Sequence, residues 1–104
     1  MRHRPMASNS SVQRKGETLV LTGVLDRDAV TAAWPQAIAQ LDGIRTLDLS
    51  GVQRLDSAGV AMLAELAARL RSTAASPVTV VGEASGLDEL RAAYRLSPTF
   101  DFQA

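Results

Sequence analysis

The sequence predicts a single α/β domain: a mixed β-sheet with an N-terminal antiparallel hairpin, and helices packed against the sheet. Strand-like and helix-like hydrophobic periods follow one another in the order strand, strand, helix, strand, helix, strand, helix. Only a tight turn separates the first two strands, which makes them antiparallel neighbours. Each later strand–helix–strand passage is long enough for a parallel crossover. A length of 104 residues suits one domain with one core.

The composition is typical of a globular chain and excludes several classes of function. Hydrophobic residues make up 46% and charged residues 21% of the chain, as in folded domains. The 11 basic and 11 acidic side chains cancel, so we expect no nucleic-acid partner. The absence of cysteine excludes thiolate chemistry and suits a reducing compartment.

Two stretches of the sequence, a polar one at the N-terminus and a long uncharged one, indicate where the folded domain lies and whether it crosses a membrane. Residues 1–11 are polar and lack the apolar run of a signal peptide, so we expect a disordered tail or a non-native remnant there and the folded domain over residues 12–104. The longest uncharged stretch, residues 29–41, is too short for a membrane-spanning helix, and we expect no direct membrane insertion.

The first half of the chain predicts a hairpin and then a helix. Strands on either side of Lys15-Gly16 alternate clearly in residues 19–24. Helical periodicity follows over residues 26–43, where Asp26 or Asp28 can cap the start. Pro35 conflicts with this helix because an interior proline costs about 3 kcal/mol. Either the helix kinks there, or its regular part begins near Trp34.

The second half predicts two buried-type strands and two helices. Residues 44–51 form a short strand, and a loop carrying Val52 and Leu55 leads to a helix from Ser57 to about Arg71. Residues 76–82 form the last strand, with Pro77 near its start, where a missing N–H is tolerated. Residues 85–96 form the third helix, which begins with the capping-box spacing of Ser85 and Asp88.

The helix that begins at Ser57 has an apolar stripe that must face the sheet, made of Val60, Leu63, Ala64, Leu66, Ala67 and Leu70. Glu65 and Arg69 form an i,i+4 pair that marks the solvent side. On the wheel, Met62 falls on that exposed side with Ala58 and Ala61 near it. Small residues allow close approach, and methionine adapts to a partner's shape. The pattern is therefore either a docking surface or the ordinary scatter of exposed apolar residues.

Asp56 and Ser57, at the start of this helix, allow more than one interpretation. Both residue types are preferred N-caps, and a cap contributes about 1 kcal/mol. A helix N-terminus also favours a phosphate, although the Asp56 carboxylate beside it would repel one. A phosphoryl group on Ser57 would instead add nearly two negative charges to the surface.

Catalysis and metal binding find little support. A nucleophilic serine needs a base, and the one histidine, His3, lies in the predicted tail. The G-x-S-x-G frame of a nucleophile elbow is missing, as are cysteines or a histidine pair for a metal. Asp26 and Asp28 are better explained as helix-start acids, and Asp48 as part of a turn. We expect no enzyme activity, no metal and no cofactor.

A strand ending in LDLSGV (residues 47–52), a short connection, and LDSAGVAML (residues 55–63) opening a helix together resemble the STAS domain. This family is shared by sulfate transporters and anti-sigma factor antagonists, and the resemblance runs from about Gly16 to Pro98. Residues 19–34, LVLTGVLDRDAVTAAW, and residues 90–98, LRAAYRLSP, are most similar to the MlaB-like branch, the STAS subunits of Mla phospholipid ABC transporters.

The resemblance implies a non-catalytic cytoplasmic subunit, peripheral to the inner membrane through its partner. That partner would be the ATPase subunit of the transporter (MlaF-like), and through it the membrane permease, in a system that maintains outer-membrane lipid asymmetry. The implied contact residues are Asp56, Ser57, Ala58, Gly59 and Met62. The branch often has threonine at the position of Ser57, whereas anti-sigma factor antagonists have a serine that the partner kinase phosphorylates. The alternative is therefore an antagonist switched by phosphorylation of Ser57.

Overall fold

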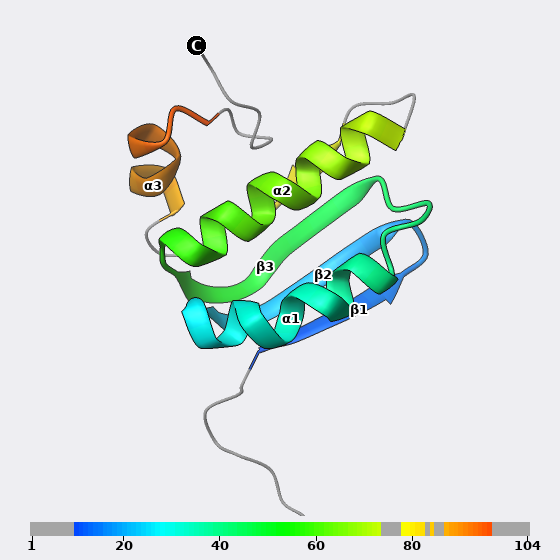
Figure 1. Ribbon diagram of the computed structural model, residues 1–104, viewed down its shortest axis with the longest axis horizontal. Helices are drawn as coiled ribbons and strands as arrows, with labels where there is room; N and C mark the ends of the chain where they lie inside the picture. The colour runs from blue at the N-terminus through cyan, green and yellow to red at the C-terminus, as the bar shows by residue number, and fades with distance from the viewer. Residues whose placement is uncertain (1–9, 74–77, 83, 85–86, 97–104) are drawn as a thin grey trace, which may run out of the picture.

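The computed structural model describes residues 10–73, 78–82, 84 and 87–96, and within them four strands form one mixed sheet (Figure 1). The strand order is β1 (Ser11–Lys15), β2 (Thr18–Leu25), β3 (Thr46–Leu55) and β4 (Thr79–Val81). The β1–β2 hairpin is antiparallel, and the β2–β3 and β3–β4 pairs are parallel. The predicted fold class is confirmed. Strand β1 begins one residue before the predicted domain boundary, and residues 1–9 lie outside the described residues.

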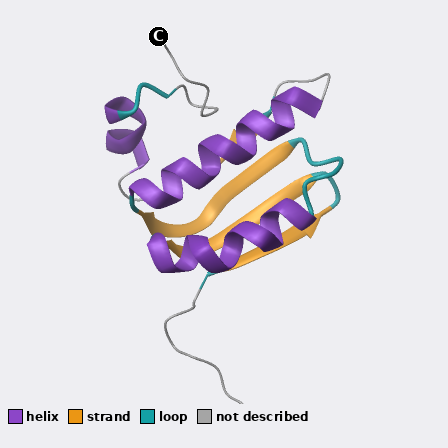
Figure 2. Ribbon diagram, in the orientation of Figure 1, coloured by secondary structure: helices purple, strands orange, loops and turns teal. Residues whose placement is uncertain are grey.

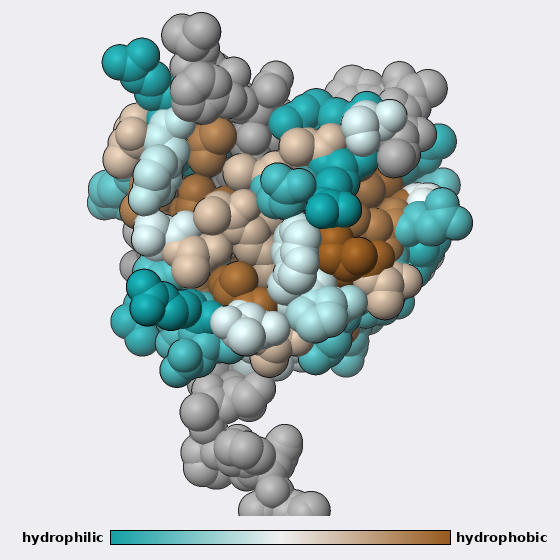
Figure 3. Space-filling view, viewed as in Figure 1, coloured by the Kyte–Doolittle hydropathy of each residue, from teal (hydrophilic) through white to brown (hydrophobic). Residues whose placement is uncertain are grey.

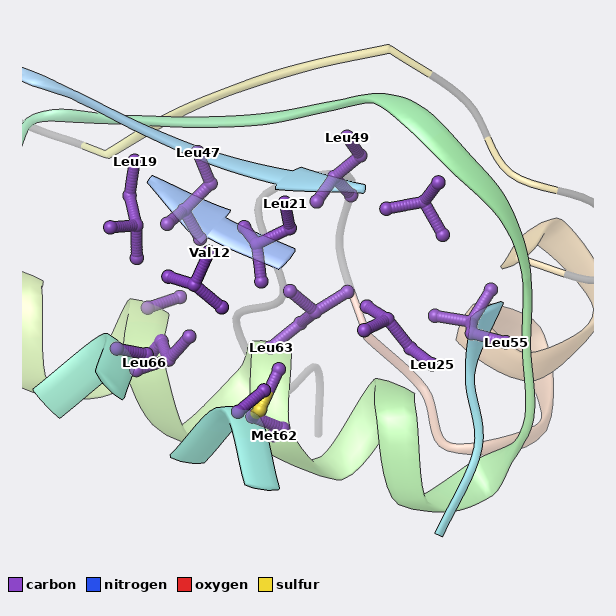
Figure 4. Close-up of a cluster of buried hydrophobic side chains, with 14 of the residues drawn as sticks. Val12, Leu19, Leu21, Leu25, Leu47, Leu49, Leu55, Met62, Leu63 and Leu66 are labelled. Carbon is purple, nitrogen blue, oxygen red and sulfur yellow. The ribbon is translucent and has the colours of Figure 1, made fainter. Parts of the chain in front are cut away.

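Helices α1 (Arg27–Ala39) and α2 (Ser57–Thr73) lie side by side on one face of the sheet, and α3 (Leu87–Ala93) lies near the start of α2 (Figures 1 and 2). The core is the layer between this sheet face and the helices. Figure 4 shows leucines of β2 and β3 pointing toward Leu63 and Leu66 of α2. Strand β2 alternates along its whole length because only one of its faces is covered, and the side chains of Leu19, Leu21 and Leu25 are fully buried.

Strand β3 is longer than predicted, and the expected loop carrying Val52 and Leu55 is part of it. Two register shifts against β2 explain the error. Between the pairs Val20–Asp48 and Thr22–Gly51, and again between Gly23–Val52 and Val24–Arg54, β3 contains one residue more than β2. Each extra residue is a β-bulge, which breaks the period-two alternation by which a strand is recognised in sequence. The buried side chains of β3 consequently follow spacings of two, three and three residues.

Helix α1 continues through Pro35, so the alternative in which its regular part begins near Trp34 is wrong. Asp26, rather than Asp28, is the N-cap, since its Oδ1 accepts a hydrogen bond from the Ala29 N–H at 3.0 Å. The buried face of α1 consists of Ala29, Ala33 and Ala37. These small side chains let α1 pack close to the sheet and to α2, and this packing offsets the cost of an interior proline.

The last strand and helix differ in detail from the prediction. Strand β4 is at an edge of the described sheet, where Thr79 and Val81 are exposed, so it is not a strand buried on both faces. Pro77 and Ser85 lie outside the described residues, and with them the predicted strand start and capping box. Asp88 is in the first turn of α3, where a carboxylate is favoured by the helix dipole.

Met62 is buried, with 3% of its surface exposed, and its predicted place on the solvent side of α2 is wrong. It lies three residues after Gly59 and four before Leu66, which are both buried, and Figure 4 shows it on the side of α2 toward α1. Because α1 packs beside α2, the buried face of α2 is wider than contact with a sheet alone requires. The i,i+4 pair does mark the solvent side, since Arg69 Nε lies 3.2 Å from Glu65 Oε2 and both side chains are about half exposed.

We predict that Met62→Ala lowers the free energy of unfolding by about 2–5 kcal/mol, because it leaves a cavity between α1 and α2. Urea denaturation measures the change. Val81→Ala serves as the control, because Val81 is 42% exposed and its truncation should cost about 1 kcal/mol or less. An effect of Met62→Ala as small as that of the control would place Met62 at the surface after all.

Candidate docking surface at the start of helix α2

Asp56 anchors the start of α2 to the carboxyl ends of β2 and β3. Its backbone N–H donates to the Leu25 carbonyl oxygen at 3.3 Å. Its Oδ1 accepts from the N–H groups of Ala58 at 2.9 Å and Gly59 at 3.2 Å. Asp56 is therefore the N-cap of α2, as the first of its sequence interpretations proposed. With this carboxylate oxygen committed to the helix start, Ser57 is the first helical residue, and its side chain is exposed.

Gly59 lets the first turn of α2 lie directly against the strand ends. A Cβ atom on Gly59 would lie 2.5 Å from the Leu25 carbonyl oxygen and 2.9 Å from Leu55 Cβ. Both distances are shorter than those that real Cβ atoms show. The Leu25 carbonyl group is part of the backbone, so it cannot rotate out of the way as a flexible side chain could. The glycine of the D-S-x-G pattern is thus required by close packing rather than by an unusual backbone angle. Gly59 is buried, so it holds the surface in position without itself being exposed.

The outward side of the same turn forms an apolar hollow, which we call the α2 groove. Its volume is about 480 Å³, and its lining consists of Ser57, Ala58, Val60, Ala61, Ala64, Tyr94 and Leu96. Figure 3 shows hydrophobic surface gathered over the first half of α2 and toward α3. Alanines form the floor, whereas Tyr94, which is 46% exposed, and Leu96 come from the turn that follows α3.

The α3 side of the groove is built by a Schellman turn. The Leu96 N–H donates to the Arg91 carbonyl oxygen at 2.8 Å, and the Arg95 N–H donates to that of Ala92 at 3.2 Å. Arg95 stands at the left-handed position with φ of 56°, which costs a non-glycine residue on the order of 1–2 kcal/mol. The turn reverses the chain after α3 and brings Leu96 back to the groove.

The structure separates the predicted contact residues into two groups. Asp56 and Ser57 are exposed and Ala58 is half-buried, so these three are available to a partner. Gly59 and Met62 are buried and cannot contact a partner from this surface, which corrects their inclusion. Five lining residues were missed as site residues, namely Val60, Ala61, Ala64, Tyr94 and Leu96. The three-residue spacing of Ala58, Ala61 and Ala64 was a usable signal, but no sequence signal placed the end of α3 beside them.

The remaining aspartates also have local structural roles. Asp48 Oδ1 accepts from the Ser50 hydroxyl at 2.6 Å and from the Ser50 N–H at 2.9 Å. The hydrogen bond from the Ser50 side chain, then that from its backbone, lowers the pKa of Asp48, and Lys15 adds a smaller attraction. Asp26 caps α1 and Asp56 caps α2. Among the described residues, no three histidine, cysteine, aspartate or glutamate side chains gather to hold a metal ion.

The family match assigns this α/β domain, with its mixed sheet and the α2 helix seated on the strand ends, to the STAS class. The chain belongs to the MlaB-type STAS family: the family described as "Mlab, STAS domain" matches residues 10–97. No curated protein matches the chain. Within the described residues, no helix has the length and hydrophobicity that a membrane crossing requires.

The solved structures that are similar to this chain include the following two. One, described as "Crystal Structure Analysis of Mglu", is 30% identical with a TM-score of 0.47, over 72% of this chain and 19% of that chain. The chain therefore spans only a small part of that protein. The other is the anti-sigma factor antagonist SpoIIAA in its unphosphorylated form, 19% identical with a TM-score of 0.47, over 81% of this chain and 97% of that chain.

We predict that Gly59→Ala lowers the free energy of unfolding by about 1–3 kcal/mol, because the new methyl group overpacks the contact with the Leu25 carbonyl. Helix propensity alone predicts the opposite sign, a gain of about 1 kcal/mol. Thermal and urea unfolding measure the difference, with Ala68→Gly on the exposed side of α2 as a calibration of propensity. A stabilised Gly59→Ala variant would show that the first turn of α2 does not touch the strand ends.

Proposed function

We propose that this chain is a non-catalytic cytoplasmic STAS subunit that docks through the α2 groove on the ATPase subunit (MlaF-like) of a phospholipid ABC transporter. It would support the assembly and activity of that transporter, which maintains outer-membrane lipid asymmetry, and would reach the inner membrane only through its partner. The observation that carries the proposal is an open apolar hollow at the α2 start, in a chain of the MlaB-type family.

The shape and chemistry of the groove support docking of a protein. Its floor of alanines lets a partner approach the α2 backbone closely, and burying apolar area is worth about 25 cal/mol per Å². Asp56, Ser57 and Arg95 supply polar groups around the apolar centre, as in the rim of a typical interface. A stable interface buries about 1,200–2,000 Å² in total, so the groove would be the centre of a larger contact.

The local chemistry supports a role without catalysis. Ser57 is the one serine that lines the groove, and a nucleophilic serine needs a base to accept its proton. No histidine is among the described residues, and Asp56 holds the helix start. ATP hydrolysis would therefore belong to the partner, and this subunit would act by binding.

We predict that Ala61→Arg weakens binding of the cognate ATPase subunit at least tenfold, because a long charged side chain would fill the floor of the groove. Co-expression and co-purification with that ATPase and its permease measure the loss. Ala68→Arg is the matched control, since Ala68 is exposed on the same helix and does not line the groove. Both variants should unfold within about 0.5 kcal/mol of the parent chain. Normal binding by Ala61→Arg would reject the groove as the docking surface.

The second candidate is an anti-sigma factor antagonist controlled by phosphorylation of Ser57, and the exposure of Ser57 at the edge of the groove favours it. A phosphate there adds about −1.5 to −2 charges next to the Asp56 carboxylate, which disfavours an apolar partner by desolvation and repulsion.

For this second function we expect that a fraction of the protein from growing cells carries one phosphate, on Ser57. This phosphorylated fraction should no longer bind the anti-sigma factor kinase. Intact-mass and peptide analysis of protein from several growth conditions measures this, and Ser57→Ala removes the modification. If the chain is unmodified under every condition and is recovered with an ABC ATPase, the antagonist function is rejected and the transporter function remains.

A further inference from the structure

Arg95 has a backbone conformation that a residue with a side chain rarely adopts. It stands at the left-handed position of the Schellman turn after α3, with φ of 56°. Glycine is the usual residue at this position, because it has no Cβ atom to crowd the neighbouring carbonyl oxygen. The other described residues with positive φ are all glycines, namely Gly16, Gly23, Gly43 and Gly82. An arginine at this point therefore makes the turn less stable than a glycine would.

No polar contact within the chain offsets this strain. The Arg95 side chain is exposed, and no hydrogen bond or ion pair joins its guanidinium to another described residue. The nearby acid of α3 is already paired, since Asp88 Oδ1 lies 3.5 Å from Arg91 Nη1. The helix dipole favours a cation at a helix C-terminus only slightly at an exposed position, and α3 has only seven residues. The guanidinium of Arg95 is thus available to a partner.

Arg95 also lies beside the surface that a partner would use. The residues on either side of it, Tyr94 and Leu96, both line the α2 groove. A long arginine side chain at this position can place its guanidinium at the rim of the groove. The other wall is α2, which begins at the exposed carboxylate of Asp56 and the adjacent Ser57. The apolar floor therefore lies between a wall that carries a negative charge and a wall that carries a positive one.

We propose that Arg95 determines which segment of the partner fits the α2 groove, by binding the carboxylate of an acidic residue that stands beside the apolar side chains of that segment. The inference rests on the proposed function, because the partner is the ATPase subunit that docks there. The strain at Arg95 is retained because it holds a cation at the rim, where glycine would offer only backbone.

The charges of the two walls select this occupant. A guanidinium presents a planar fork of N–H donors that matches the two oxygens of a carboxylate. Docking over the apolar floor would exclude water from the pair, so the pair would be stronger than one on an open surface. Asp56 repels the same carboxylate from the α2 wall, so the segment is favoured only with its acid toward Arg95. A segment without an acid would leave the guanidinium desolvated and unpaired.

The experiment measures the thermal midpoint of the complete 104-residue chain and its Kd for the purified cognate ATPase subunit. Arg95→Gly should raise the midpoint, because it relieves the left-handed strain, and should weaken binding at least tenfold, because it removes the guanidinium. An arginine that only closed the turn would give the higher midpoint with an unchanged Kd. Arg95→Lys keeps the charge without the planar fork and should bind with an affinity between those of Arg95→Gly and the parent.

Arg54→Gln is the matched control. It removes one exposed positive charge at the end of β3, from a residue that does not line the groove, and should change the Kd less than about threefold. Arg95→Glu should abolish binding. Replacing the exposed acids of the ATPase subunit by lysine, one at a time, should yield one variant that restores binding to Arg95→Glu, and this variant identifies the paired acid.

The inference is overturned if Arg95→Gly binds as tightly as the parent, if it lowers the thermal midpoint, if Arg54→Gln weakens binding equally, or if no lysine variant restores binding to Arg95→Glu. In these cases the proposed function stands, provided that the parent binds the ATPase subunit and Ala61→Arg does not. A parent chain that fails to bind, or an Ala61→Arg variant that binds normally, rejects the proposed function and this inference with it.

Discussion

The contact between the first turn of α2 and the carboxyl ends of β2 and β3 is the constraint on which the rest of the surface depends. The Leu25 carbonyl accepts the Asp56 N–H and lies so close to Gly59 that no side chain fits between them. Successive helix residues are rotated by about 100°, so seating one turn determines the direction of every later side chain. The side that carries Val60 and Leu63 is turned into the core, and the side that carries Ala58 and Ala61 is turned outward.

The two bulges of β3 make that contact possible. Each adds a residue relative to β2, and together they return Val52 and Leu55 to the helix-covered face. They also allow β3 to run on until its last residue pairs with Leu25, the last residue of β2. The two strands therefore end together, and α2 can begin on both at once. A regular strand of the same sequence would turn Val52 to the other face, because the side-chain period is two and Val52 lies five residues after Leu47.

Small side chains and local hydrogen bonds give the exposed start of α2 an apolar surface of defined shape. Asp56 Oδ1 accepts hydrogen bonds from two backbone N–H groups, and Asp48 Oδ1 accepts from its neighbour Ser50, so both carboxylates hold the local structure in place. The alanine row leaves an apolar floor, and the strained turn at Arg95 aims the end of α3 back toward it. Strain of this kind persists where the surrounding structure over-determines it. Together these features shape the apolar surface of the groove.

The sequence by itself determined what depends on neighbours along the chain. Alternation in residues 19–24 predicted β2, the turn at Lys15-Gly16 predicted the hairpin, and the helical pattern after Asp56 predicted that α2 begins at Ser57. The sequence also indicated that Asp56 and Ser57 are exposed. Only the tertiary structure decided the length of β3, the burial of Met62 and the meeting of Tyr94 and Leu96 with α2. The reason is that bulges, a second helix alongside and a chain reversal at a distant turn change which face of a segment is covered. A periodicity read within one segment contains no information about the element that will cover it.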